Sequence, residues 1–138
     1  MLLLCALAMH NALAWERYRI DGDAPGEVAV KRGTTDPRYM LKDSKGEILV
    51  DNERMFRLDR PEDDAIKNAL FTSGTAPRDA ECYFTAIMTT LCWVPAGTRI
   101  VRRGNASDAF ATTSGVVLCA DSVAGQGPCM EVQPMTAK

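Results

Sequence analysis

The stretch Thr75–Arg103 reads TAPRDAECYFTAIMTTLCWVPAGTRIVRR, and its interpretation decides the fold expected for the chain. Apolar residues recur in it at the spacing of one buried helix face, at positions 80, 83, 84, 87, 88 and 91. A strand would alternate apolar and polar residues, whereas both alternate sets here are mixed. The periodicity therefore predicts a helix over this segment.

Two features limit that helix. Several of its residues are β-branched and lose rotamer freedom in a helix, namely Thr85, Ile87, Thr89 and Thr90. Val94 precedes Pro95, and a residue before proline is pushed out of the helical region. We therefore expect the helix to end near Cys92.

Residues 1–14, MLLLCALAMHNALA, differ in composition from the rest of the chain. An apolar run followed by Ala12-Leu13-Ala14 has the form of a signal peptide with an A-x-A cleavage site, although a basic n-region is missing. A lipoprotein anchored at Cys5 is the alternative. We expect residues 1–14 to be a signal peptide, cleaved before Trp15, and residues 15–138 to form a single globular domain.

Four cysteines follow the leader, at positions 82, 92, 119 and 129. An even number in an exported domain predicts two disulfides; a zinc site is the alternative, but no C-x₂-C pair is present. In one helix, Cys82 and Cys92 would lie about 15 Å apart, so we expect each to pair with Cys119 or Cys129. One observation opposes this pairing: Cys119 and Cys129 are symmetric about Ala124, as across a hairpin.

The remaining segments are mostly strand-like. Asp43-Ser44-Lys45-Gly46 suits a type I turn within a hairpin, and Asp51-Asn52 predicts a further turn. Asp59 and Glu62 predict a capped helix that ends near Gly74. The expected strands cover residues 27–32, 39–42, 47–50, 55–58, 98–103, 109–112, 116–119 and 129–132. The expected fold is α+β: a small antiparallel β-sheet or partly open barrel with one or two helices packed on it and two disulfides.

Histidine is the most informative absence. The 138 residues contain one histidine, His10, and it lies in the leader. Without it, no Ser-His-Asp or Cys-His arrangement can form, and paired cysteines leave no thiolate nucleophile. Carboxylate chemistry, as in glycoside hydrolysis, remains open. We expect no catalytic residues, metal or cofactor.

Basic residues cluster at two strand ends. Gly26–Gly33 (GEVAVKRG) aligns without gaps with Gly97–Gly104 (GTRIVRRG). Shared turn–strand–turn chemistry explains the match, and a pseudo-repeat that places two basic strand ends in register is the functional alternative. The candidate binding residues are Lys31, Arg32, Arg99, Arg102 and Arg103.

These patterns favour a binding module over an enzyme. The formal net charge of −2 requires neither nucleic acid nor a membrane as partner, and nothing after the leader is long and apolar enough to span a bilayer. Clustered arginines favour an acidic protein or another anionic ligand. We therefore expect a periplasmic or secreted binding or inhibitory protein. The alternative is a small carboxylate-dependent hydrolase of the same compartment, and Asn105-Ala106-Ser107 is a sequon of open significance.

Overall fold

The fold is described from a computed structural model, which describes residues 15–22, 25–102, 105–120 and 128–135. The expected signal peptide and Arg103 lie outside these residues. The chain divides into two compact units, a first unit of Met1–Arg54 and Pro134–Lys138 and a second unit of Met55–Gln133. This division does not test the expected single domain, which stays a prediction.

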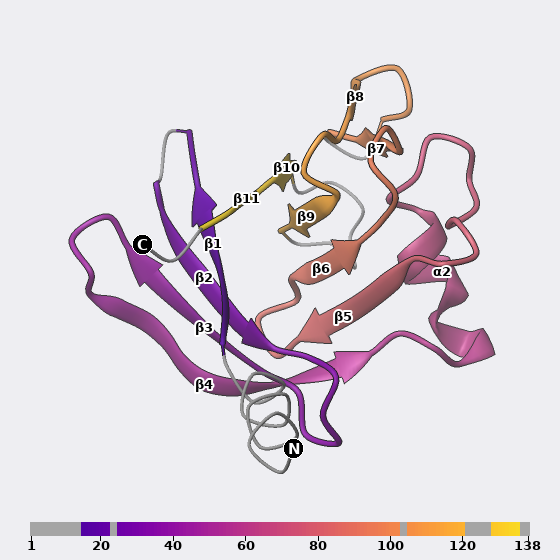
Figure 1. The fold of residues 1–138 in the computed structure, drawn as a ribbon. Coiled ribbons are helices and arrows are strands. Elements are labelled where there is room, and N and C mark those ends of the chain that lie inside the picture. Colours follow the sequence, from indigo (N-terminus) through magenta and orange to yellow (C-terminus); the bar gives the residue numbers. More distant parts are fainter. Residues whose placement is uncertain (1–14, 23–24, 103–104, 121–127, 136–138) are drawn as a thin grey trace, which may run out of the picture. The chain divides into compact units, whose positions relative to one another are not determined.

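Antiparallel strands are the main regular structure of both units (Figure 1). Within the described residues, nine strands are hydrogen-bonded in the order β10-β9-β6-β5-β4-β3-β2-β1-β11, and β7 and β8 form a separate pair. The antiparallel sheet is confirmed, but it is larger than the small sheet expected. The strands are β1 (Glu16–Ile20), β2 (Gly26–Lys31), β3 (Arg38–Asp43), β4 (Ile48–Arg57), β5 (Glu81–Thr85), β6 (Thr90–Trp93), β7 (Arg99–Val101), β8 (Ala109–Ala111), β9 (Val116–Cys119), β10 (Cys129–Glu131) and β11 (Gln133–Pro134).

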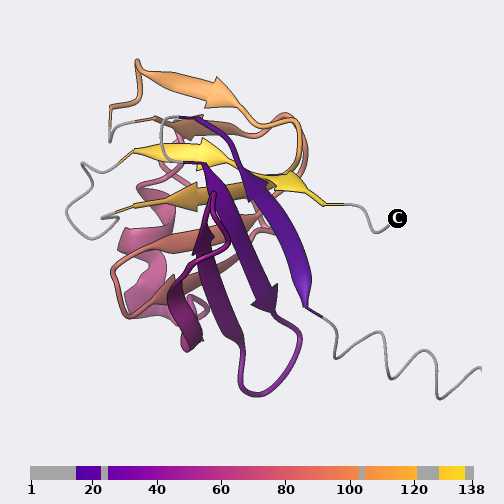
Figure 2. The ribbon, with the colours of Figure 1, turned by 90° about the vertical axis from the view of Figure 1, so that its left-hand side faces the viewer.

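The first unit is a meander of β1, β2, β3 and the first part of β4, with Met135 N–H donating to the carbonyl of Arg17 at 2.9 Å. Figure 2 shows β1, β2 and β3 side by side. The predicted turn at Asp43 is confirmed, because its side chain accepts hydrogen bonds from the N–H groups of Lys45 and Glu47. The turn expected at Asp51-Asn52 is wrong. β4 continues through it, with Asn52 at φ 52° and the pairing register shifted.

The helix predicted across residues 80–91 is also wrong. β5 and β6 form a hairpin there, in which Tyr83 lies opposite Leu91 and Cys82 opposite Cys92. All four of these side chains are buried, so both faces of the hairpin are covered. A strand covered on both faces loses the alternation that identifies it in a sequence. The near-continuous apolar run then matched a helix by coincidence.

Both disulfides are present, and the pairing expected from the helix is wrong. Cys82 bonds Cys92 and Cys119 bonds Cys129, each across two neighbouring antiparallel strands. The Cα atoms are 4.1 and 4.0 Å apart, the close approach of directly opposite residues. The symmetry of Cys119 and Cys129 about Ala124 was the correct signal.

Within the residues that the structure describes, helical structure is short and lies in the second unit. The 3-10 helix η1 (Pro61–Asp63) leads into α2 (Asp64–Asn68). It begins one residue later than predicted, because Asp63 rather than Glu62 accepts from the N–H of Arg60. It also ends well before Gly74, the predicted cap. No helix among the described residues has the length and apolar content that crossing a membrane requires.

The core of the second unit is built on its disulfides. All four cysteines belong to one buried cluster with side chains from the segments around them. In β6, Cys92 is two residues after Thr90, so the two side chains lie on the same face of the sheet. Thr90 lies directly opposite Cys119 in β9, so the disulfides Cys82–Cys92 and Cys119–Cys129 share that face. The other buried members are Leu58, Leu70, Phe71, Ile100, Val101 and Val117.

Candidate functional site

Six cations share one face of the first unit. In β1, Arg17 and Arg19 alternate with the buried Tyr18, so they point to the opposite side of the sheet from it. Directly opposite residues of neighbouring strands share a face, so the register identifies which residues of β2, β3 and β4 lie on the same face as Arg17 and Arg19. We call this surface the basic face; it consists of Arg17, Arg19, Lys31, Arg38, Lys42 and Arg54.

Three of these cations form a row across the sheet. Lys31 lies directly opposite Arg38, and Arg38 directly opposite Arg54. Neighbouring strands are about 4.8 Å apart, so the row brings like charges close together. At the β1 end, the Lys31 ammonium sits 4.7 Å from the centre of the Trp15 ring, a cation–π contact.

One carboxylate offsets the repulsion between the two arginines of the row. Asp36 accepts from Nη2 of Arg38 at 2.9 Å and from Nε of Arg54 at 3.1 Å. Hydrogen bonds from Arg38 first, and then from Arg54, lower the pKa of Asp36 below its ordinary value. Nη1 of Arg38 donates to the carbonyl of Asn52 at 3.0 Å, within the irregular part of β4. Both guanidinium groups are therefore held in fixed positions.

The arginines of β1 are held in the same way. Glu27 receives two hydrogen bonds from Arg17, from Nε at 2.8 Å and Nη2 at 2.9 Å. Asp21 receives two from Arg19, from Nε at 2.8 Å and Nη2 at 3.3 Å. The hydrogen bond from Arg17 is the main cause that lowers the pKa of Glu27. Each carboxylate uses the Nε edge of its arginine and leaves Nη1 of the fork for a further acceptor.

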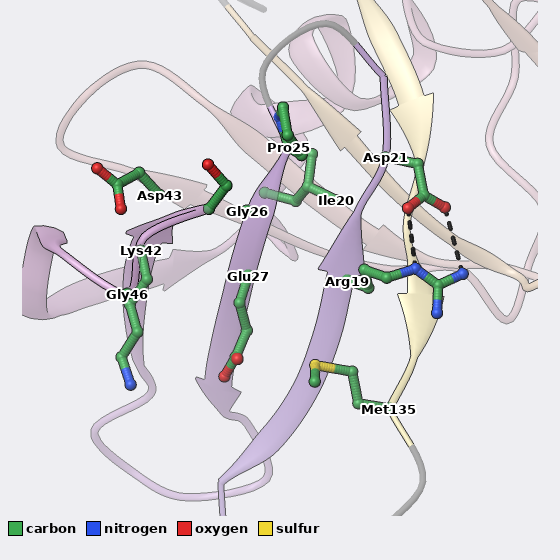
Figure 3. A pocket seen from close by; sticks show the side chains of 11 residues that line it. Arg19, Ile20, Asp21, Pro25, Gly26, Glu27, Lys42, Asp43, Gly46 and Met135 are labelled. Carbon is green, nitrogen blue, oxygen red and sulfur yellow. Dashed lines mark hydrogen bonds and ion pairs between the residues drawn. The ribbon is translucent and has the colours of Figure 1, made fainter.

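A hollow of about 290 Å³ lies at one end of the basic face (Figure 3). Its lining includes Arg19 and Lys42 from the face, with Met135 and Pro25 as apolar walls. Gly26 also lines it; any side chain at this position would meet the backbone carbonyl of Lys42. Glycine is therefore required for β2 to approach β3 at this end.

The residues predicted as a binding site come from both units. Lys31 belongs to the basic face, whereas Arg32 pairs with Glu16 at 3.0 Å. Arg99 and Arg102 belong to the second unit, where Arg102 pairs with Asp108 at 3.5 Å and stacks on Phe110. Whether the two basic strand ends converge stays a prediction, and Arg103 lies outside the described residues.

Sequence reasoning missed the other five cations of the basic face. The signal was available as period-two placement of arginine and lysine in RYRI (residues 17–20) and RYMLK (residues 38–42). Among the described residues, no three of the His, Cys, Asp and Glu side chains are grouped to hold a metal ion. Comparisons with protein-family models, curated proteins and solved structures gave no match to this chain.

Proposed function

We propose that this chain is an exported, disulfide-stabilised binding protein that holds an acidic protein partner on its basic face. The observation that carries the proposal is the concentration of six cations on one sheet face of a chain whose net charge is −2. Such a local field attracts an acidic surface and orients it before contact, although the whole molecule is weakly acidic. This function includes inhibition, if the partner is an enzyme.

The arginines that are already paired with carboxylates of the chain are suited to binding further carboxylates. Arg17 and Arg19 each bind a carboxylate of the chain through Nε and Nη2, and Arg54 binds Asp36 through Nε. Nη1 of each arginine is left to donate to a carboxylate of the partner. A side chain already held in place loses little conformational entropy on binding. The face is therefore pre-organised for planar anions, and carboxylates are the anions that proteins present most often.

The disulfides support export. Two bridges within one small unit form and persist in oxidising compartments, and are rare where thiols are kept reduced. They are compatible with the periplasm or the exterior, the location that the leader suggests. The proposed localisation rests on these two features together.

The state of the carboxylates favours binding over hydrolysis. A general acid needs a carboxyl group whose pKa is raised. In the part of the chain that the structure describes, four carboxyl groups have a pKa below the ordinary value: Glu27, Asp36, Asp63 and Glu131. Carboxylates held ionised by arginines and N–H groups act as structural anchors for those groups.

The test begins with capture of the partner. The mature protein is used as bait in its own envelope or culture extract, the captured proteins are identified by mass spectrometry, and the partner is purified. Its affinity is then measured for wild type and for the double variant Lys31→Glu with Arg54→Glu. We expect at least a tenfold loss, because the variant reverses two charges of the row.

A matched control carries the same change in charge outside the basic face. Arg57 and Arg60 are exposed arginines of the second unit. Arg57 pairs with Asp59 at 3.9 Å, and Arg60 pairs with Glu62 at 3.6 Å and with Asp63 at 3.4 Å. Arg57→Glu with Arg60→Glu should leave the affinity unchanged. An equal loss of affinity in both double variants would show that binding depends only on net charge. No loss of affinity in either variant would show that the basic face does not take part in binding.

A further inference from the structure

The β5–β6 hairpin ends in a tightly defined loop. Thr85 N–H donates to the carbonyl of Thr89 at 2.9 Å, and Met88 N–H donates to the carbonyl of Thr85 at 3.0 Å. The Thr85 hydroxyl accepts from the N–H of Thr89 at 3.2 Å. We call Ala86–Thr89 the hairpin tip. Its backbone is fixed by three hydrogen bonds rather than left free.

Met88 holds an unfavourable backbone conformation at this tip. Its φ is 62°, in the left-handed region that methionine rarely adopts. The other residues of the described chain with positive φ are six glycines and Asn52, which tolerate that region. Among the described residues, Met88 is therefore the exception: a residue at positive φ that does not favour this conformation. A strained residue that persists in a structure points to a function for its side chain.

Exposed apolar side chains gather at the same end of the hairpin. Ile87 and Met88 are 52% and 53% exposed, and Phe56, opposite Phe84 in the register, is 52% exposed. No charged residue occurs from Cys82 to Thr98. A soluble chain normally places glycine, asparagine or aspartate at such a loop. The tip instead presents aliphatic groups without adjacent charge.

The disulfide Cys82–Cys92 closes the base of this hairpin. The cysteines lie three residues before Thr85 and three residues after Thr89, directly opposite one another. A covalent clamp this close to the loop restricts its motion in the unbound protein. Pre-organisation of this kind increases affinity because less conformational entropy is lost on binding.

We propose that the hairpin tip inserts into an apolar cleft of a protein partner, with Ile87 and Met88 as its anchoring side chains. An exposed, hydrogen-bonded and uncharged loop is complementary to a concave apolar site. Two other occupants fit less well. A membrane-binding loop is normally flanked by lysine or arginine, which this segment lacks, and two copies meeting tip to tip would bury little surface. This surface is independent of the basic face.

The test places a photo-crosslinking amino acid at position 87 of the disulfide-bonded mature protein. The matched control carries it at Leu49, which is 60% exposed and lies in the first unit. After irradiation in envelope or culture extract, a protein joined at position 87 and absent from the control at position 49 is identified and purified. That purified protein is the probe for affinity measurements.

Wild type, Ile87→Ser, Met88→Asn and Leu49→Ser are then compared. We expect a loss of roughly 30-fold for each tip variant, as for an interface hot spot, and none for Leu49→Ser. The melting temperature of Met88→Asn should be unchanged or higher, because asparagine tolerates a positive φ. If Met88→Asn binds more weakly but has an unchanged melting temperature, the Met88 side chain acts in recognition and is not needed for folding.

Four results would overturn the proposal. The first is that no specific adduct forms at position 87, and the second is that the adduct protein binds Ile87→Ser as tightly as wild type. The third is that wild type binds phosphatidylcholine vesicles and Ile87→Ser does not. The fourth is that wild type is a dimer in light scattering and Ile87→Ser is a monomer. Raised salt distinguishes this surface from the basic face, because it weakens charge recognition and leaves apolar insertion intact. The Lys31→Glu, Arg54→Glu variant should retain the adduct.

Discussion

Arg38 and Arg54 lie directly opposite one another on β3 and β4, and the carboxylate of Asp36 binds both. Asp36→Asn would make the basic face more positive and at the same time release the two guanidinium groups. If charge alone determined binding, the variant would bind an acidic partner more tightly. We expect faster dissociation and weaker binding, because pre-organisation is lost. Surface plasmon resonance with the purified partner measures this, and tighter binding would show that clamping is unimportant.

Lowering the pH should break the ion pairs that Glu27 and Asp36 form with the arginines of the basic face. Hydrogen bonds from arginine lower the pKa values of Glu27 and Asp36 below their ordinary values of 4.5 and 3.8. A carboxyl group with a lowered pKa in the folded state adds stability that is fully present above its ordinary pKa. That contribution is lost as the pH falls through the lowered value.

NMR titration of the side-chain carboxyl carbons tests this directly. We expect the midpoints of Glu27 and Asp36 to lie below the ordinary values, and Arg17→Gln to return the midpoint of Glu27 upward. A midpoint for Glu27 at or above its ordinary pKa would contradict the ion pair.

The two disulfides should stabilise the fold to a similar extent. Each closes a loop of the same sequence separation, 10 residues, and both lie in the same buried cluster. Loss of either pair by substitution to alanine should cost about 2–4 kcal/mol in the free energy of unfolding. Denaturant unfolding measures the cost, and a non-reducing peptide map should show the pairs 82–92 and 119–129. Any cross-pairing would contradict the strand register.

Gly26→Ala should destabilise the first unit. The added methyl group would meet the carbonyl oxygen of Lys42, which belongs to the backbone and cannot rotate away. Forced overpacking of this kind costs about 1–3 kcal/mol. Ser44→Ala, an exposed change beside the same hollow, is the control and should unfold like wild type. Equal stability of Gly26→Ala and wild type would show that β2 and β3 do not approach closely there.

Local chemistry allowed part of the fold to be predicted. The turn at Asp43, the strands around it and the existence of two disulfides follow from residue types at fixed spacing. The β5–β6 hairpin did not, because its buried Tyr83 and Leu91 lie on the face opposite the cysteines, and no alternation remained. The symmetry of Cys82 and Cys92 about Ile87 would have indicated a hairpin, as the symmetry about Ala124 did for the second bridge.

The candidate site was harder to predict than the fold. Lys31 was recognised as part of a basic strand end, but its neighbours in the row come from β3 and β4. Their alignment depends on the register of two hairpins, including a bulge at Asn52 that the sequence presented as a turn. Segments such as RYRI show alternation, yet only pairing reveals that their cations share a face.

The central claim is that the basic face binds an acidic protein partner. The most direct measurement is the affinity of the purified partner for wild type and for Lys31→Glu with Arg54→Glu, each at low and at raised salt. The account predicts weaker binding by the variant, weaker binding by wild type at raised salt and a smaller salt effect in the variant. Equal affinities for both proteins, insensitive to salt, would contradict it.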